Sequence, residues 1–393
     1  MARHSPPRTP DTLRFSEGTV SHERETPHEA ALRELIEEAN RSGESRSAPR
    51  RHHLVPVFYL KQWADDGKIR VTDIDKGKSW ITTPKRAASE IDYYRIESPD
   101  LDPAEIPPLL FEVTLSKIER WGADFIAAVT DDPIAALRDD EMRVLFSNYM
   151  AFQYVRGRDY RTFTHASMTD LFKLTYGEIT DEGIRHELSE RGLETSPENL
   201  ALFRGFVDQL NSGEITVGPH QASAIGMSGE LAQEIGLHLF ARGWHIYQVP
   251  EILLTCDEPV IPIAGPPHPR GERGGVGDAA VVIFPLTPGL LLAMFDGFNA
   301  IPAPPHELGP HDVGQLNREI AAASSTYTFE RPVRNLASGF KLPKKAAAIS
   351  RAAPVPVDDT AEKHLIRSHR PSRWANAKRI PPWPVERWYQ QSG

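Results

Sequence analysis

Residues 51–83 read RHHLVPVFYLKQWADDGKIRVTDIDKGKSWITT, and this stretch decides the fold class. It begins as an extended segment, and Pro56 then opens a short helix that ends at Asp65-Asp66-Gly67. KIRVTDID alternates with period two, Lys76-Gly77-Lys78 marks a turn, and SWITT runs back, which predicts a β-hairpin. We therefore expect the N-terminal part of the body to mix helix and strand.

Downstream of this stretch the pattern becomes helical. Apolar residues recur at three- and four-residue spacing from Phe111 to Val129, which predicts a buried helix face. A second long helix is expected to open at Asp139-Asp140 and to run through residues 142–163. Residues 165–240 are expected to form shorter helices. The inner stripe of the second helix starts apolar, but it continues into Gln153, Arg156 and Tyr160.

Beyond Gly243 the period changes again. Short β-rich runs follow one another, separated by Pro and Gly, as is typical of an antiparallel sheet. The chain is therefore expected to have an α+β fold, with a helical middle region and a mainly antiparallel sheet. The runs are WHIYQV, EILLTC, VIPIA, AVVIFPL, LLLAMF and, after one more helix, TYTFE.

The chain of 393 residues is long enough for one large domain or two ordinary ones. We expect a partly disordered leader with one short helix over residues 1–50, capped by Thr26. A single α+β domain is expected over residues 51–335, and a basic tail with Pro and Trp over 336–393. Residues 341–393 hold 11 Lys or Arg and 4 Asp or Glu, whereas residues 1–340 hold 34 and 50. The tail is basic and the body is acidic.

The composition excludes several classes of protein. Hydrophobic residues are 40% and charged residues 25%, which argues against wholesale disorder, collagen and coiled coil. The single cysteine cannot form an internal disulfide, and no zinc-type Cys/His spacing occurs. No signal peptide and no apolar run of about 18 residues is present. These features favour a cytoplasmic protein that does not span a membrane.

The basic tail suggests two kinds of partner. Its Lys and Arg residues stand beside Trp374, Trp383 and Trp388, so it could hold the phosphates and bases of a nucleic acid. It could equally lie on its own acidic body. The intramolecular alternative is favoured, because charged termini usually pair within the chain and tryptophans favour docking.

Three polar clusters interrupt the apolar pattern and are candidates for chemistry. The first is His52-His53, because imidazole can act as a base, an acid or a metal ligand. Neighbouring side chains of an extended segment point to opposite faces, so both histidines are not expected to bind one metal. The structural alternative is a histidine hydrogen-bonded to backbone at a strand end.

The other two clusters follow later in the chain. Asp257 ends an apolar strand, where it could bind a metal or cap the turn that Pro259 forces. Gln153 and Arg156 lie on the helix stripe, and the Arg156 guanidinium could clamp a phosphate or hold a structural acid. We expect His52 or His53 to share one polar pocket with Asp257 and Arg156, because isolated buried polar groups are costly.

These clusters, in this order, resemble the domain of unknown function 4238 family. The likeness covers about residues 51–331 and rests on HHLVPVFYLKQW, on AFQYVRGR and on Thr255 to Val260. Cys256 and Glu258 depart from the Ser and Asn that are usual in that family, which puts the hydrogen-bonding role of the Ser in doubt. The resemblance implies a fold and candidate sites, but no reaction.

The His-His step followed by Pro is also similar to the metal site of HNH-type nucleases, although the next helix lacks a further His or Asn ligand. The first hypothesis is therefore a metal-assisted phosphodiester hydrolase. Its catalytic residues would be His52, His53 and Asp257, with a divalent metal on His53 and Asp257 and with substrate on Gln153 and Arg156. The alternative is a non-catalytic binding or interaction module.

Overall fold

The computed structural model describes most of the chain: residues 27–44, 51–91, 93–96, 101–103, 105–265, 270–297, 305–346, 349–355 and 363–389. The helix expected in the leader is α1 (Pro27–Glu44), which packs against α4 (Leu110–Asp131). Its proposed cap, Thr26, lies outside the described residues.

The stretch 51–83 forms the elements that its pattern predicts, and a short helix and strand that were not predicted follow it. The hairpin is confirmed, and Gly77 takes a positive φ of 63° in its turn. Tyr59 and Trp63 are fully buried, and the Trp63 indole donates to the Leu253 carbonyl at 2.7 Å. The elements are β1 (Arg51–His53), α2 (Val57–Leu60), η1 (Lys61–Trp63), β2 (Ile69–Asp73), β3 (Lys78–Thr82), α3 (Pro84–Ala87) and β4 (Ser89–Ile91).

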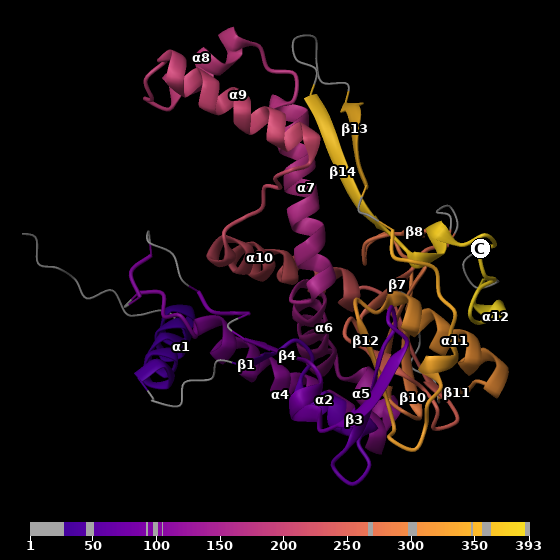
Figure 1. The fold of residues 1–393 in the computed structure, drawn as a ribbon. Helices are drawn as coiled ribbons and strands as arrows, with labels where there is room; N and C mark the ends of the chain where they lie inside the picture. Colours follow the sequence, from indigo (N-terminus) through magenta and orange to yellow (C-terminus); the bar gives the residue numbers. More distant parts are fainter. Residues whose placement is uncertain are drawn as a thin grey trace, which may run out of the picture.

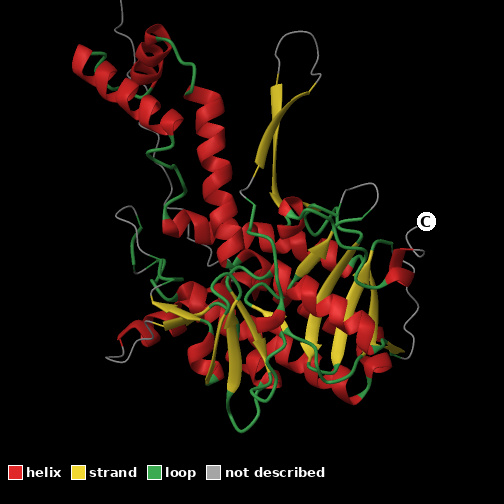
Figure 2. Cartoon of the chain, turned by 45° about the vertical axis from the view of Figure 1, so that its right-hand side comes forward, coloured by secondary structure: helices red, strands yellow, loops and turns green. Residues whose placement is uncertain are grey.

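The hairpin does not stand alone, because strands from the far end of the chain complete its sheet. β12 (Tyr327–Glu330) pairs antiparallel with β2, and β6 (Thr255–Cys256) pairs with β12. The order is β3-β2-β12-β6, while β1 and β4 form a separate two-stranded ladder. Figure 2 shows the strands of the body in yellow among its red helices. The N-terminal signature and the C-terminal strands therefore form one structural unit.

The helical middle contains α4, α5 (Pro133–Arg138), α6 (Asp140–Val155), α7 (Arg158–Tyr176), α8 (Asp181–Glu190), α9 (Pro197–Ser212) and α10 (Gln221–Phe240). The expectation of one helix through residues 142–163 is wrong, because α6 ends before Arg156 and α7 begins after Gly157. Gly157 is extended, with φ −69° and ψ 160°. The Glu258 carboxylate, which lies against Gly157 and accepts from the Asp159 N–H, produces this break.

Helices α7, α8 and α9 rise from the body as an arm, defined here as residues 158–212 (Figure 1). The arm has a small core of its own, formed by the buried side chains of Ile184, Leu188, Val207 and Leu210. None of these four belongs to the three apolar clusters of the body. Helices α8 and α9 thus pack around a core separate from that of the body, while the start of α7 packs on the body.

The second sheet lies between two layers. It is mainly antiparallel, with the order β11-β5-β10-β9-β7, and only β11 pairs in parallel. Val282 and Phe284 face the cluster that includes α4, α6 and α10, whereas Val281 and Ile283 face α11 (Pro310–Ala323). Burial on both faces explains the uninterrupted apolar runs. The strands are β5 (Gly243–Gln248), β7 (Ile261–Ile263), β9 (Val281–Thr287), β10 (Leu290–Phe295) and β11 (His306–Glu307). The α+β prediction is confirmed.

The described part of the tail lies on the body. Trp374 and Trp388 are buried, and Arg373 pairs with Asp75 at 2.7 Å. β13 (Ile349–Val355) and β14 (Lys363–Pro371) form a hairpin beside α7 (Figure 1). β14 also pairs with β8 (Glu272–Arg273). The other elements of the tail are η2 (Ala337–Gly339), η3 (Arg373–Asn376) and α12 (Glu386–Tyr389). Within the described ranges, no helix is long and apolar enough to cross a membrane.

Candidate functional site

The junction between α6 and α7 is where the predicted polar clusters come together. Glu258 follows β6, and its carboxylate Oε1 accepts from the Asp159 backbone N–H at 2.9 Å, in the first turn of α7. A Cβ at Gly157 would lie 2.1 Å from Glu258 Oε2. A carboxylate is favourable at a helix N-terminus, where unpaired N–H groups point outward. Glu258 therefore starts α7, and only glycine leaves room for it.

Asp257, the predicted catalytic residue and metal ligand, is also held by backbone. Its Oδ1 accepts from Ser325 N–H at 2.8 Å, and its Oδ2 accepts from Thr326 and Tyr327 N–H at 2.8 and 3.0 Å. The residue is only 3% exposed. Burial raises the pKa of Asp257, although these three hydrogen bonds and nearby Arg158 oppose the shift. This carboxylate joins the end of β6 to the start of β12.

Arg158 links Asp257 to the β1–β4 ladder. Its guanidinium pairs with Glu90 of β4, and its Nη1 lies 4.0 Å from Asp257 Oδ2 and 3.3 Å from the Thr326 hydroxyl. Glu90 stands opposite His52 in the register of β1 and β4. Arg158 thus joins the end of β6 to β4, the strand that pairs with the histidine-bearing strand β1.

Arg156 and Gln153, the predicted substrate-binding pair, lie together. The Arg156 side chain is 2% exposed; its Nη1 pairs with Glu119 Oε1 at 2.9 Å, and its Nε donates to Gln153 Oε1 at 3.0 Å. The Gln153 amide donates to the Leu54 carbonyl at 2.9 Å. Burial alone would lower the pKa of Arg156, but Glu119 raises it above the usual value. Arg156 therefore holds a structural acid, one of the two roles considered from the sequence.

The two histidines point to different partners, as expected for an extended segment. His52 is fully buried; its Nδ1 accepts from the Tyr94 N–H at 2.6 Å, and its ring stacks on Tyr94. The Tyr94 hydroxyl in turn donates to the Arg156 carbonyl at 3.2 Å. His53 Nε2 lies 3.2 Å from the Lys85 carbonyl. His52 thus reaches Arg156 through Tyr94, while His53 contacts the backbone next to α3.

Hydrogen bonds connect His52, Tyr94, Arg156 and Gln153, whereas Asp257 is held by the N–H groups of residues 325–327 and lies 4.0 Å from Arg158, two residues after Arg156. Among the described residues, no group of three His, Cys, Asp or Glu side chains is arranged to hold a metal ion. The assignments of catalysis to His52, His53 and Asp257, and of metal to His53 and Asp257, stay predictions.

A pocket opens beside this junction, between the start of α7 and the start of α10, and its empty space of about 420 Å³ includes open solvent at its mouth. Of the predicted site residues, only Arg156 lines it. Its other polar lining residues are Tyr160, Arg161, Thr164, His165 and Ser228, and its larger apolar ones are Tyr94, Phe111, Val155, Ile225 and Met227. No Asp or Glu lines the pocket, so its wall is cationic and apolar.

Sequence reasoning missed Arg161 and His165. They lie four residues apart and therefore on one face of a helix, a spacing that could have marked them. It also missed Glu112, whose pKa is raised to about 7 by burial and by Glu119. Glu112 and Glu119 lie seven residues apart on α4 and therefore on one side of that helix, but Arg156, whose charge acts on both, comes from another helix.

The residues of the junction come from the opening motif, the mid-chain helices and the β6–β12 ends, all of which lie within residues 51–333. No curated protein and no solved structure matches the chain. A family model described as "Protein of unknown function (DUF4238)" matches residues 51–333, well over half of the chain. This range holds both sheets, the arm and the pocket, and on this match the chain belongs to the DUF4238 family.

Proposed function

We propose that this protein is a binding module for a small organic anion, held in the pocket between α7 and α10. The observation that carries the proposal is the lining, which includes Arg156, Arg161 and His165 but no carboxylate. Ligand pockets are typically concave and mostly apolar, with a few convergent polar groups that orient the ligand. An Arg guanidinium suits a carboxylate or phosphate, because it can donate two parallel hydrogen bonds.

Arg161 is the residue best placed to meet the anion. Its Nη2 donates to the Tyr93 carbonyl at 3.0 Å, and its guanidinium lies 3.6 Å from the centroid of the Tyr93 ring. These contacts position the side chain without neutralising it, since no described carboxylate lies within ion-pair distance of Arg161. Arg156, by contrast, is already paired with Glu119.

Thermal unfolding of the full chain tests the proposal. We would add small carboxylates and phosphates, and ammonium compounds of matched size, because a ligand that binds only the folded state raises the melting temperature. The anions should stabilise the wild type and lose most of this effect in Arg161→Gln. Arg185→Gln, at an exposed site on α8, is the matched control. Equal stabilisation by ammonium compounds would refute anion binding.

The metal-assisted phosphodiester hydrolase makes a different prediction. Protein purified without chelator should then contain a divalent metal, and His53→Ala and Asp257→Ala should both lose it together with hydrolysis of bis(4-nitrophenyl) phosphate. The binding proposal instead predicts that anion stabilisation persists in EDTA. Elemental analysis and the thermal assay with EDTA distinguish the two functions.

A further inference from the structure

The charges around the pocket limit the kind of anion that fits it. The Arg156 charge is balanced by Glu119 at 2.9 Å. Arg161 has no acidic partner among the described residues, so it is the one arginine of the wall left to a ligand. A single unbalanced guanidinium matches one negative charge better than two.

One further carboxylate near the pocket, Glu112, opposes a more highly charged ligand. Glu112 follows the lining residue Phe111, and it interacts electrostatically with Tyr94, Arg156 and Glu119. In a partly buried site such interactions are weakly screened. A phosphate dianion would therefore meet more repulsion than a carboxylate.

The rest of the wall is apolar. Phe111 from α4, Val155 from α6, and Ile225 and Met227 from α10 form the apolar part of the lining. Arg161 and His165 are four residues apart on α7 and therefore share one side of that helix. His165 lies against the chain before α10, since a Cβ at Gly218 would be 1.8 Å from His165 Nδ1. The pocket thus has a polar side on α7, while α4, α6 and α10 supply its apolar side.

We infer that the ligand is a monocarboxylate with an apolar body, an inference that rests on the proposed function. The carboxylate would accept hydrogen bonds from Arg161, with His165 beside it. The aliphatic or aromatic body would lie against Phe111, Ile225 and Met227. Burial of each methylene should tighten binding about fourfold, as expected for apolar surface removed from water.

Isothermal titration calorimetry of the full chain tests this inference with four probes: octanoate, butanoate, octyl phosphate and octylammonium. Octanoate should bind most tightly, butanoate and octyl phosphate at least tenfold more weakly, and octylammonium not measurably. Arg161→Gln should weaken octanoate at least tenfold. Met227→Asp should do the same, because Met227 is 46% exposed and tolerates a charge that repels the carboxylate. Arg185→Gln should match the wild type.

The possible failures are distinguishable. If octyl phosphate binds as tightly as octanoate, or butanoate matches octanoate, the apolar monocarboxylate is wrong while anion binding stands. If octylammonium binds as well as octanoate, or no probe binds, both this inference and the proposed function are refuted. Circular dichroism of each variant would show that a lost affinity is not a lost fold.

Discussion

At the scale of single residues, the junction depends on one glycine. Gly157 lies between two helices that would otherwise continue into each other, and the Glu258 carboxylate occupies the space where a side chain would begin. Glu258 cannot easily move aside, because it is 4% exposed and accepts from the Asp159 N–H. Tight packing of this kind leaves little tolerance for an added methyl group.

We therefore predict that Gly157→Ala lowers the free energy of unfolding by about 1–3 kcal/mol, the range for overpacking a buried site. Gly205→Ala is the matched control, because Gly205 lies within α9 and a Cβ there meets nothing within 4 Å. That change should be neutral or stabilising by about 0.5–1 kcal/mol. Urea unfolding measures both. An equal effect of the two variants would show that the close approach of Glu258 is unimportant.

Glu112 leads to a prediction about pH. Burial, and then the charge of Glu119, raise its pKa from 4.5 to about 7. The folded state therefore binds this proton more tightly than the unfolded state does. The contribution of protonated Glu112 to the free energy of unfolding is therefore fully present below pH 4.5, and it is lost as the pH rises through 7.

Glu112→Gln should remove this pH-dependent loss of stability, because the amide cannot ionise. Relative to the wild type, its free energy of unfolding should increase between pH 4.5 and pH 7, by up to about 2 kcal/mol after allowance for partial exposure. Urea titrations at several pH values measure the difference. Glu230→Gln, at an exposed position on α10, is the control and should show no such trend. A constant difference across this pH range would contradict the prediction.

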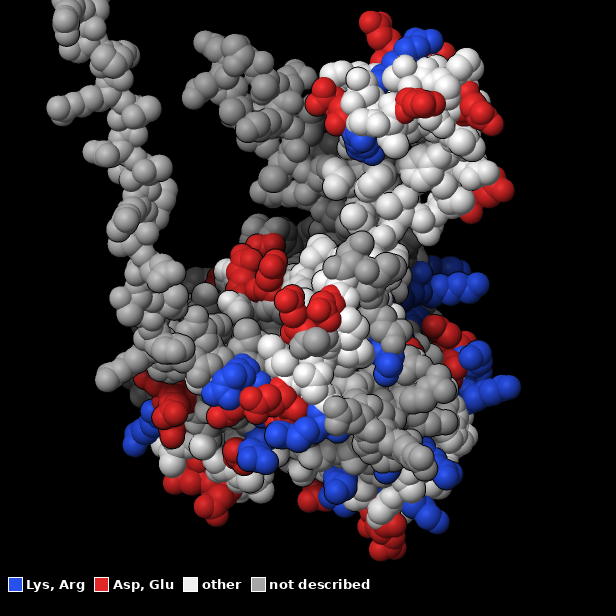
Figure 3. All heavy atoms as spheres, turned by 90° about the vertical axis from the view of Figure 1, so that its left-hand side faces the viewer, with Lys and Arg blue, Asp and Glu red and all other residues white. Residues whose placement is uncertain are grey.

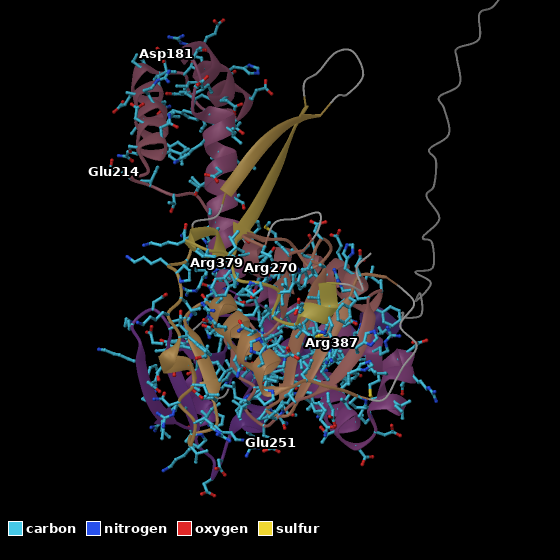
Figure 4. All side chains as sticks on the ribbon, turned by 90° about the vertical axis from the view of Figure 1, so that its right-hand side faces the viewer. Asp181, Glu214, Glu251, Arg270, Arg379 and Arg387 are labelled. Carbon is cyan, nitrogen blue, oxygen red and sulfur yellow. The ribbon has the colours of Figure 1, made fainter. Side chains whose placement is uncertain are left out.

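At the scale of elements, α7 connects two regions. Its first half lines the pocket through Arg161 and His165, and its second half carries the arm, where Tyr176 contacts Phe203 of α9 at a centroid distance of 5.8 Å. Asp181 and Glu214 stand out from this part of the chain (Figure 4). A small separate core is expected to open more readily than the large core of the body.

We predict that Leu210→Ala loosens the arm without unfolding the body. Leu210 is fully buried, so its truncation should cost about 2–5 kcal/mol, and this cost should fall on α8 and α9. Hydrogen exchange should accelerate in residues 181–212 and stay unchanged in β9 and β10. Leu202→Ala is the control, because Leu202 is 68% exposed. Faster exchange throughout the chain would show that arm and body unfold together.

At the scale of the whole molecule, the basic tail and the acidic body are joined. Arg373 pairs with Asp75, Lys345 pairs with Asp159 of α7, and the Trp374 indole donates to the Glu319 carboxylate. The body face drawn in Figure 3 mixes acidic and basic side chains. Two basic residues of the tail, Lys345 and Arg373, are therefore already paired within the chain, whereas Lys378 and Arg379 are exposed.

We predict that single-stranded and double-stranded oligonucleotides bind weakly, and that binding falls steeply between 50 and 200 mM salt. Lys378→Glu combined with Arg379→Glu should abolish what binding there is. Fluorescence anisotropy measures it. Substitution of these exposed residues is preferable to truncation of the tail, because truncation would expose the surfaces that Trp374 and Trp388 cover. Tight, salt-insensitive binding would contradict this expectation.

The local structure of this protein follows from its amino-acid pattern alone. The period-two hairpin, the apolar stripe of α4 and the uninterrupted runs of β9 and β10 are set by neighbouring residues, so their elements and the α+β class could be predicted. The same pattern missed the break at Gly157, because the carboxylate that starts α7 comes from Glu258, about a hundred residues later.

The contacts of the polar residues, by contrast, depend on the tertiary structure. Asp257 and Arg156 could be identified as unusual from their positions, but their partners, the N–H groups of residues 325–327 and Glu119, come from distant segments. The pocket is formed by α4, α6, α7 and α10 together, so no single periodicity marks it. Local patterns encode which face of an element is buried, whereas a site depends on which elements fold next to one another.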